Sequence, residues 1–292
     1  MKLLSMLVGL PLLLAGVVNG YALPQACSGV CTNAHDPSII RRDDGTYFRF
    51  STGNKIAIHS APDLTGPWKY LGAAVPDSSK INLKGRDDLW APEVNKVGDT
   101  YYLYYSVSSF GTQNSAIGLT QSKTMEPGSW VDAGSIGVTS DASKKYNAID
   151  PNLIQVGSEY YLNFGSYWQG LHQTKMTSPP TKSAGGANQI AFTSNFEVVE
   201  AAFEFAYKGY YYMFFSKGSC CGYNKTRPAK GKEYRILSHD WVYGPGGQGV
   251  YNDPKHGPVL YYHYVDTRVG YADGDKRFGW NKLDFSSGWP TV

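Results

Sequence analysis

The most regular pattern along the chain is an apolar or alternating run, a glycine-containing turn and an aromatic run, and it recurs five times. The segments begin at residues 35, 90, 149, 199 and 251 and read HDPSIIRRDDGTYFRFS, WAPEVNKVGDTYYLYYS, IDPNLIQVGSEYYLNFGS, VEAAFEFAYKGYYYMFFS and YNDPKHGPVLYYHY. Four of the turns, DGT, GDT, GSE and KGY, are typical of tight β-hairpins. No long segment keeps apolar residues at the spacing of a helix face, so the pattern predicts strands throughout.

The spacing of this repeat predicts the fold. Its heads fall near residues 36, 91, 150, 200 and 252. A period of about fifty residues built from short strands indicates a β-propeller. We therefore expect an all-β, five-bladed β-propeller formed by residues 21–292 as a single domain. A β-sandwich with ordinary hairpins is the alternative, but it does not explain why the heads match as well as the turns.

Residues 1–20, MKLLSMLVGLPLLLAGVVNG, do not belong to the repeat. One lysine precedes an apolar stretch that is broken by Pro11 and ends in small residues, which is the plan of a secretory signal peptide. The stretch is too short for a good membrane span. The sequence therefore predicts a secreted, extracellular protein, and the acceptor sequence at Asn224 predicts N-glycosylation.

The chain has four cysteines, and an oxidising compartment would allow them to form disulfides. Cys27 and Cys31 are spaced for a local loop, whereas Cys220 and Cys221 are adjacent and would need a strained bridge or remain separate thiols. Three pairings are possible, and the sequence leaves them open. A metal site built from these cysteines is disfavoured, because no second metal-binding spacing accompanies them.

The composition limits the classes of molecule that we expect the protein to bind. The formal net charge is +3 and the charges are scattered, so we expect neither nucleic acid nor a membrane as a partner, and we expect a monomer. Aromatic residues make up 14% of the chain. Most would fill strands, and the remainder could stack on sugar rings.

Three heads of the repeat carry carboxylates: Asp36, Asp150 and Glu200. In a propeller the first strands of all blades begin at one face around the channel, so these groups are expected to crowd one pocket and raise at least one pKa. Glycoside hydrolysis needs such carboxylates on two sides of a bond. A calcium site is an alternative, but the spacing does not match a calcium loop. A purely structural role, in which the carboxylate caps the turn before an inner strand, could explain one of these residues but explains all three together less well.

An ordered set of motifs gives a specific resemblance. HDPSII, DDLWAPEV, SSFGTQNSAIGL, YNAIDPNL, NFGSYW, VEAAFEF, CCGY, VYGPGGQGV and FSSGWP, in this order, resemble the secreted endo-1,5-α-L-arabinanases of glycoside hydrolase family 43. The resemblance implies hydrolysis of 1,5-α-L-arabinofuranosidic bonds in arabinan or arabino-oligosaccharides with inversion. It implies Asp36 as the general base, Glu200 as the general acid and Asp150 as the carboxylate that tunes the acid. In inverting enzymes base and acid stand about 6.5–9.5 Å apart.

The same resemblance implies a substrate groove across the channel mouth. It is expected to be lined by His35, Trp90, Phe110, Gly111, Asn147, Ser166, Tyr167 and Trp168. His239 matches a histidine that relatives direct toward an ion in the central channel, often assigned as calcium. No cofactor is expected to be required for the chemistry itself.

The chain departs from the family pattern at one place. Between KEYRI, at residues 232–236, and LSHDW, relatives carry roughly thirty more residues, so blade four is expected to be truncated. Ala201 and Ala202 also follow Glu200 where relatives often carry Gly or Pro. Two further functions remain open: an exo-acting arabinofuranosidase or xylosidase of the same family, and a catalytically inactive propeller that only binds carbohydrate.

Overall fold

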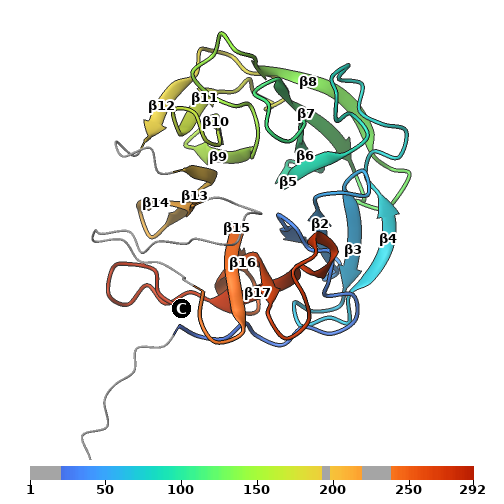
Figure 1. Ribbon diagram of the computed structural model, residues 1–292, viewed down its shortest axis with the longest axis vertical. Coiled ribbons are helices and arrows are strands. Elements are labelled where there is room, and N and C mark those ends of the chain that lie inside the picture. The colour runs from blue at the N-terminus through green and yellow to red at the C-terminus, as the bar shows by residue number, and fades with distance from the viewer. Residues whose placement is uncertain (1–20, 193–197, 219–237) are drawn as a thin grey trace, which may run out of the picture.

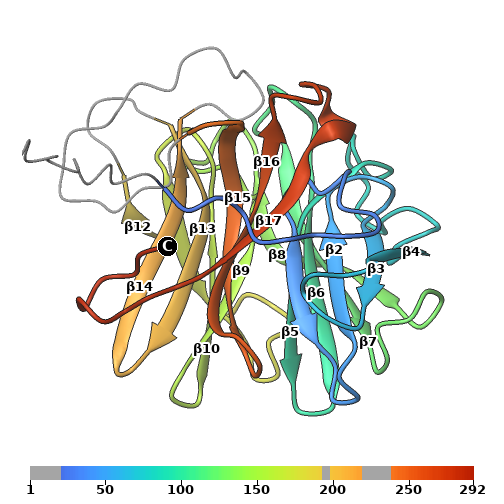
Figure 2. The same cartoon turned by 90° about the horizontal axis from the view of Figure 1, so that it is seen from below.

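The computed structural model describes residues 21–192, 198–218 and 238–292, and within these ranges the protein is an all-β propeller (Figure 1). Antiparallel sheets are arranged around a central axis, and strands run roughly parallel to it (Figure 2). A single 3₁₀ turn, η1 (Asp273–Asp275), is the one helical element in the described ranges. None of the helical structure described there is long and apolar enough to cross a membrane.

Each sheet is built from strands that follow one another along the chain. The first contains β1 (Ser38–Arg41), β2 (Tyr47–Ser51), β3 (Ala57–Ala61) and β4 (Lys69–Ala73). The second contains β5 (Leu89–Val97), β6 (Thr100–Val107), β7 (Ser115–Ser122) and β8 (Val131–Ser140). The third contains β9 (Asn152–Val156), β10 (Glu159–Phe164), β11 (Leu171–Lys175) and β12 (Asn188–Ala191).

Two smaller sheets complete the described structure. The hairpin of β13 (Val199–Tyr207) and β14 (Tyr210–Lys217) forms a two-stranded sheet. The last sheet contains β15 (Val242–Asp253), β16 (Gly257–Asp266) and β17 (Arg277–Lys282). The predicted hairpin turns are confirmed: for instance, Gly98 takes φ +61° between β5 and β6, a conformation that glycine adopts without strain.

The fifth predicted head is wrong. The segment from Tyr251, YNDP, lies at the end of β15 and in its turn to β16, not at the start of an inner strand. Asp253 caps this turn by accepting the backbone N–H groups of Lys255 and His256 at 2.9 and 2.7 Å. Asp followed by Pro is suited to turns as well as to strand heads, which is why the pattern misled.

A backbone feature marks the true heads of the inner strands β1, β5, β9, β13 and β15. Near each head one residue has a left-handed φ: Asp36 at +43°, Ala91 at +45°, Asp150 at +58°, Ala201 at +55° and Gly247 at +54°. These residues all line one pocket. Non-glycine residues rarely adopt this conformation, and clusters of such strained residues are found mainly at functional sites.

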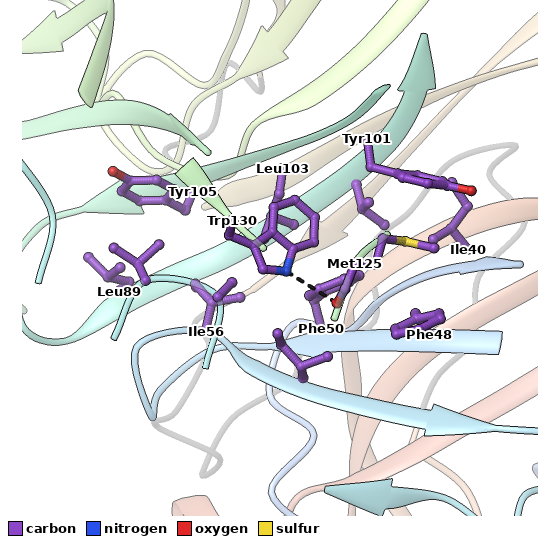
Figure 3. Packing of buried hydrophobic residues seen from close by; sticks show 14 of the residues in the cluster. Ile40, Phe48, Phe50, Ile56, Leu89, Tyr101, Leu103, Tyr105, Met125 and Trp130 are labelled. Atoms are coloured by element: carbon purple, nitrogen blue, oxygen red, sulfur yellow. Dashed lines mark hydrogen bonds between the residues drawn. The ribbon is translucent and has the colours of Figure 1, made fainter. Parts of the chain in front are cut away.

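Hydrophobic clusters fill the spaces between neighbouring sheets. Between the first two, Phe50, Ile58 and Leu103 are fully buried beside Trp130, whose indole N–H donates to the carbonyl of Met125 at 3.2 Å (Figure 3). Another cluster joins the first sheet to the last, through contacts of Tyr47 and Trp68 with Phe278 and their neighbours. The packing therefore connects the two ends of the chain.

Residues 25–34 pair with the segment of β17 and so close the ring of sheets. Gln25 donates its backbone N–H to the carbonyl of Trp280, Phe278 donates to Cys31 and Ala34 donates to Lys276, at 2.9–3.1 Å. The predicted local disulfide between Cys27 and Cys31 is present. The signal peptide, Cys220, Cys221 and Asn224 lie outside the described residues, so those predictions stay predictions.

Candidate active site

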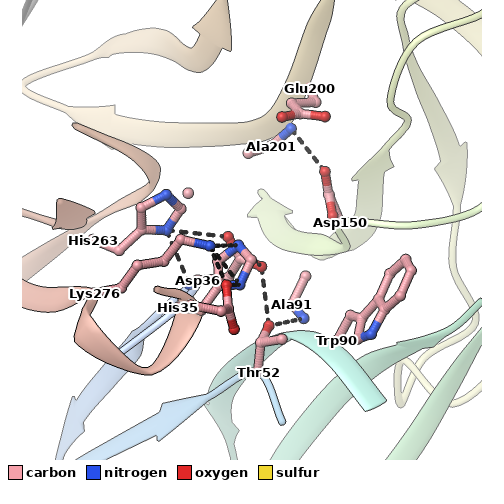
Figure 4. Close-up of polar contacts among 12 residues, drawn as sticks. His35, Asp36, Thr52, Trp90, Ala91, Asp150, Glu200, Ala201, His263 and Lys276 are labelled. Carbon is pink, nitrogen blue, oxygen red and sulfur yellow. Dashed lines mark hydrogen bonds and ion pairs between the residues drawn. The ribbon is translucent and has the colours of Figure 1, made fainter. Parts of the chain in front are cut away.

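Three carboxylates from three different inner strands face a common space (Figure 4). Asp36 precedes β1, Asp150 precedes β9 and Glu200 is the second residue of β13. Asp36 and Asp150 line the same pocket, which is also lined by Ala201, directly after Glu200. The convergence of the three predicted carboxylates around the channel is therefore observed.

Asp36 accepts a hydrogen bond and lies close to two histidines and a positive charge. Oδ2 of Asp36 accepts the hydroxyl of Thr52 at 2.9 Å, and Nδ1 of His263 lies 3.3 Å from Oδ1. Burial alone would raise the pKa of Asp36, but His35, His263 and the ammonium of Lys276 outweigh it and hold the pKa well below its usual range. Asp36 is therefore ionised at any pH near neutrality.

The positive charge near Asp36 comes from Lys276, whose side chain is almost fully buried. Its ammonium lies 3.0 Å from Nδ1 of His35 and forms an ion pair with Asp273, which also pairs with His35 at 3.1 Å. The pKa of Asp273 is lowered by its hydrogen bond to His35 and its contact with Lys276. This buried network holds a cation near Asp36.

Asp150 has the opposite electrostatic environment. Burial raises its pKa well above the usual range, and the charges of Glu200 and Asp36 raise it further. The backbone N–H of Ala201 donates to Oδ2 at 3.1 Å, so the residue after Glu200 is tied to Asp150. The pKa of Asp150 is therefore shifted in the opposite direction from that of Asp36, because two nearby carboxylates resist ionising together.

Ser166 is hydrogen-bonded to the side chain of Glu200. Its hydroxyl donates to Oε2 of Glu200 at 2.8 Å, and the two residues form an isolated β-bridge. Ser166 is buried, so its hydroxyl contacts Glu200 rather than lying open on the predicted groove. Asn147 is likewise buried, and its Oδ1 accepts the hydroxyl of Ser115 at 2.7 Å.

The predicted groove residues with aromatic rings do lie at the surface. Phe110 is 88% exposed, and Tyr167 and Trp168 expose large parts of rings whose centroids are 6.5 Å apart. Trp90 is partly exposed and donates its indole N–H to Asp88 at 3.2 Å. Gly111, next to Phe110, has φ +76° and no atom within 4 Å of a would-be Cβ.

A histidine that was not predicted, His263, lies beside Asp36. The role of His239 toward an ion in the channel stays a prediction. The ring of His239 lies against Tyr21, with centroids 5.5 Å apart, while ligand atoms of His35, Asp36 and His263 lie within 4.8 Å of one another. A Cβ on Gly247 would lie 2.7 Å from Nδ1 of His263. Because Gly247 on β15 has no side chain, the imidazole of His263 on β16 reaches the channel.

This cluster does not fit a calcium ion built into the protein. Calcium takes six to eight oxygen ligands. Here the described side chains offer one carboxylate and two imidazoles, with the ammonium of Lys276 3.0 Å from His35. We therefore derive no catalytic step through an ion.

Sequence reasoning missed Thr52, Glu93, His263, Lys276 and Gln248. Glu93 could have been found, because WAPEV occupies the same place in the repeat as HDPSI and IDPNL. Gln248 follows the left-handed residue of β15, donates to the carbonyl of Ala201 at 2.8 Å and lines the pocket. The other three reach the site from positions that do not repeat.

A propeller whose channel brings three carboxylates together, with the pKa of one lowered and that of another raised, is typical of the class of glycoside-cleaving hydrolases. Comparison with known families agrees: the model described as "Glycosyl hydrolases family 43" matches residues 30–290. The chain belongs to this family.

Individual relatives are similar over nearly their whole length. The chain is 54% identical to the "Probable arabinan endo-1,5-alpha-L-arabinosidase A" of Aspergillus clavatus, over 310 residues and 96% of each chain. It is 53% identical to the "Arabinan endo-1,5-alpha-L-arabinosidase A" of Aspergillus aculeatus, over 312 residues, 96% of this chain and 97% of that protein. Since 96% of 292 residues is about 280, about thirty of the 310 positions have no residue here, a number that agrees with the predicted shortening.

Solved structures share the fold. The Cellvibrio cellulosa α-L-arabinanase complexed with arabinohexaose has a TM-score of 0.77 and is 28% identical, with coverage of 91% of this chain and 96% of that chain. An exo-1,5-α-L-arabinanase from a bovine ruminal metagenomic library has a TM-score of 0.78 and is 25% identical, covering 90% and 98%. Arabinanases, one of them described as exo-acting, therefore share this architecture.

Proposed function

We propose that the chain is an inverting endo-1,5-α-L-arabinanase that hydrolyses arabinan and arabino-oligosaccharides. The observation that carries the mechanism is the electrostatic contrast between Asp36, held ionised by His35, His263 and Lys276, and Asp150, whose pKa is raised. The substrate follows from the arabinan-cleaving relatives at 52–54% identity.

The three carboxylates take different roles. Asp36 removes a proton from water as the water oxygen bonds to the anomeric carbon. The glycosidic C–O bond breaks, and its oxygen takes the proton carried by Glu200, so the product has the opposite anomeric configuration. Asp150, beside Glu200, shares one proton with it, and while that proton is on Glu200 the charge of Asp150 keeps it there, which tunes the acid. Asp36 then gives its proton to solvent and Glu200 takes one from solvent, which returns both carboxyl groups to their starting states.

The rings of Trp90, Phe110, Tyr167 and Trp168 are proposed to stack on arabinofuranose units at the channel mouth, around Gly111. Their exposure supports this role. His35, held between Lys276 and Asp273 beside Asp36, is proposed to contact the sugar bound at the cleavage point. For Asn147 and Ser166 the buried contacts support an indirect role, in which they shape the subsite and orient Glu200.

Five blades are proposed, with β13 and β14 as the inner strands of a shortened fourth blade. The left-handed residue at each of five inner strands supports this count. We also propose a secreted, monomeric protein glycosylated at Asn224, on the strength of the N-terminal sequence. The chemistry is proposed to need no cofactor, and dialysis against a chelator should leave the rate of arabinan hydrolysis unchanged.

The catalytic roles are tested by Asp36→Asn, Glu200→Gln and Asp150→Asn. Each should lower kcat on linear arabinan by at least about a hundredfold, since general acid–base catalysis contributes that much. Glu200→Gln should retain activity on an aryl arabinoside with an acidic phenol, which leaves without a proton, whereas Asp36→Asn should not. If all three variants remain folded and active, the chain is not the proposed enzyme.

Product analysis separates the rival activities. Endo cleavage of linear arabinan releases mixed oligosaccharides early in the reaction, and exo cleavage by an arabinofuranosidase releases arabinose alone. No hydrolysis by folded protein, together with binding to arabinan, would instead identify a carbohydrate-binding propeller.

A further inference from the structure

A fourth carboxyl group lies in the channel, and the mechanism above does not use it. Glu93 on β5 is only 5% exposed and lines the same pocket as Asp36 and Asp150. A bulge in β5 between Trp90 and Glu93, next to the left-handed Ala91, interrupts the register of the strand at this point. Glu93 follows Ala91 by two residues, as Ser38 follows Asp36 and Asn152 follows Asp150.

Of these three equivalent residues, Glu93 is hydrogen-bonded to each of the other two. Ser38 donates its hydroxyl to Oε2 of Glu93 at 3.2 Å, and Asn152 donates its amide to Oε1 at 3.2 Å. Asn95, two residues further along β5, also donates to Oε1 at 3.2 Å. One carboxyl group therefore contacts two other inner strands at once.

The direction of each bond is fixed by a further contact. The oxygen of Ser38 already accepts the backbone N–H of Val94 at 3.1 Å, so the single hydroxyl proton is available for Glu93. Oδ1 of Asn152 already accepts Asn163 and the backbone N–H of Glu204, both at 2.9 Å, so its NH₂ group faces Glu93. Val94 holds the Ser38 oxygen in place, and Asn152 cannot turn its amide away from Glu93 without breaking its bonds with Asn163 and Glu204.

The sheet of β5–β8 lies between the sheets that carry Asp36 and Asp150, and Glu93 extends from it to both. We propose that Glu93 is a positioning residue whose carboxyl group ties the strand of Asp36 to the strand of Asp150 and so fixes the distance between the base and the proton-holding pair. The inference rests on the roles proposed for Asp36 and Asp150.

The charge state of Glu93 suits this task. Burial raises its pKa to about 7, against the hydrogen bonds from Asn95, Asn152 and Ser38 that lower it. Below that pH the group is mostly neutral, so it can hold the strands without adding a negative charge beside two carboxylates. A permanently neutral side chain of the same shape should therefore perform the same function.

The test compares Glu93→Ala, which removes the link, with Glu93→Gln, which keeps an acceptor oxygen for Asn152 and an NH₂ group that can donate to Ser38. Tyr262→Phe is the matched control, because it removes a buried hydrogen bond of 2.6 Å to Asn281, two residues that are not among those lining the pocket. All three are measured as full chains, for thermal unfolding and for kcat and KM on linear arabinan.

Glu93→Ala should lower kcat about ten- to a hundredfold and leave KM within about twofold, because misplacing reacting groups by about 1 Å costs up to a hundredfold. Glu93→Gln should keep kcat within about threefold of the wild type, and Tyr262→Phe should lower the unfolding temperature without changing kcat. A folded Glu93→Ala variant with wild-type kcat overturns the proposal.

A double-mutant cycle covers the case in which Glu93→Ala does not fold. Ser38→Ala and Asn152→Ala should each lower kcat, and the double variant should lose less than the product of the two losses, because both act through Glu93. Losses that multiply independently overturn the proposal. An Asp36→Asn variant that remains active refutes the catalytic assignment instead, so the two failures are distinguishable.

Discussion

The hydroxyl of Thr52 connects the catalytic pocket to the neighbouring sheet: it donates to Oδ2 of Asp36 at 2.9 Å and accepts the backbone N–H of Ala91 at 2.8 Å. Because the N–H of Ala91 can only donate, the one hydroxyl proton is directed at Asp36. Thr52 thus orients the proposed base and stabilises its charged form.

Thr52→Val keeps the shape of the side chain and removes this donor. We expect kcat to fall about tenfold or more, since a hydrogen bond to a charged group contributes about 1.5–3 kcal/mol. The pKa of Asp36 should rise, so the acidic limb of the pH–rate profile should move to higher pH. Thr52→Ser, which keeps the hydroxyl, should behave like the wild type. Equal profiles for the Val and Ser variants would contradict this role.

Gly247 occupies a place where a methyl group has no room. A Cβ there would lie 2.3 Å from Oδ1 of Asp36 and 2.7 Å from His263. We expect Gly247→Ala to lower kcat by at least tenfold through displacement of Asp36. Gly157→Ala is the matched control, because Gly157 has a similar φ of +61° but nothing within 4 Å. If both variants lose activity equally, backbone strain and not crowding is responsible.

The raised pKa of Glu93 predicts a pH dependence of stability. Between its ordinary value of 4.5 and the native value of about 7, the folded protein binds more protons at Glu93 than the unfolded chain does. The free energy of unfolding therefore falls as pH rises through this window, by up to about 3 kcal/mol from this group. Denaturant unfolding at pH 4.5, 6 and 7.5 should show that the free energy of unfolding of Glu93→Gln rises relative to that of the wild type as the pH increases. Parallel curves for the two proteins would argue against it.

Phe110 exposes 88% of its surface beside the predicted groove, which suits stacking on a sugar ring and not packing. Phe110→Ala should raise KM for linear arabinan about three- to tenfold and change kcat little, because such contacts contribute about 0.5–1.5 kcal/mol. Tyr210 is also highly exposed, but it begins β14 after the turn at the far end of the hairpin from Glu200. Tyr210→Ala should therefore leave KM unchanged, and a matching rise in KM would remove Phe110 from the site.

The sequence predicted those parts of the site that repeat. Asp36 and Asp150 stand at equivalent heads, so their convergence with Glu200 followed from the period alone. The error at Tyr251 arose because an Asp-Pro pair serves a turn as well as a head. Thr52, His263 and Lys276 could not be predicted in this way, since each reaches the pocket from a strand or turn outside the repeated position. Only the packing of neighbouring sheets brings them to Asp36.

The location of the partners of Asp36 has a consequence for biosynthesis. Asp36 is made early, but His263 and Lys276 belong to the last thirty residues, and β17, which pairs with residues 25–34, is among them. A chain growing on the ribosome therefore holds its three carboxylates before it holds His263 and Lys276, two of the groups that lower the pKa of Asp36. Catalytic competence should therefore depend on closure of the ring by β17, so chains that stop before His263 should have no activity.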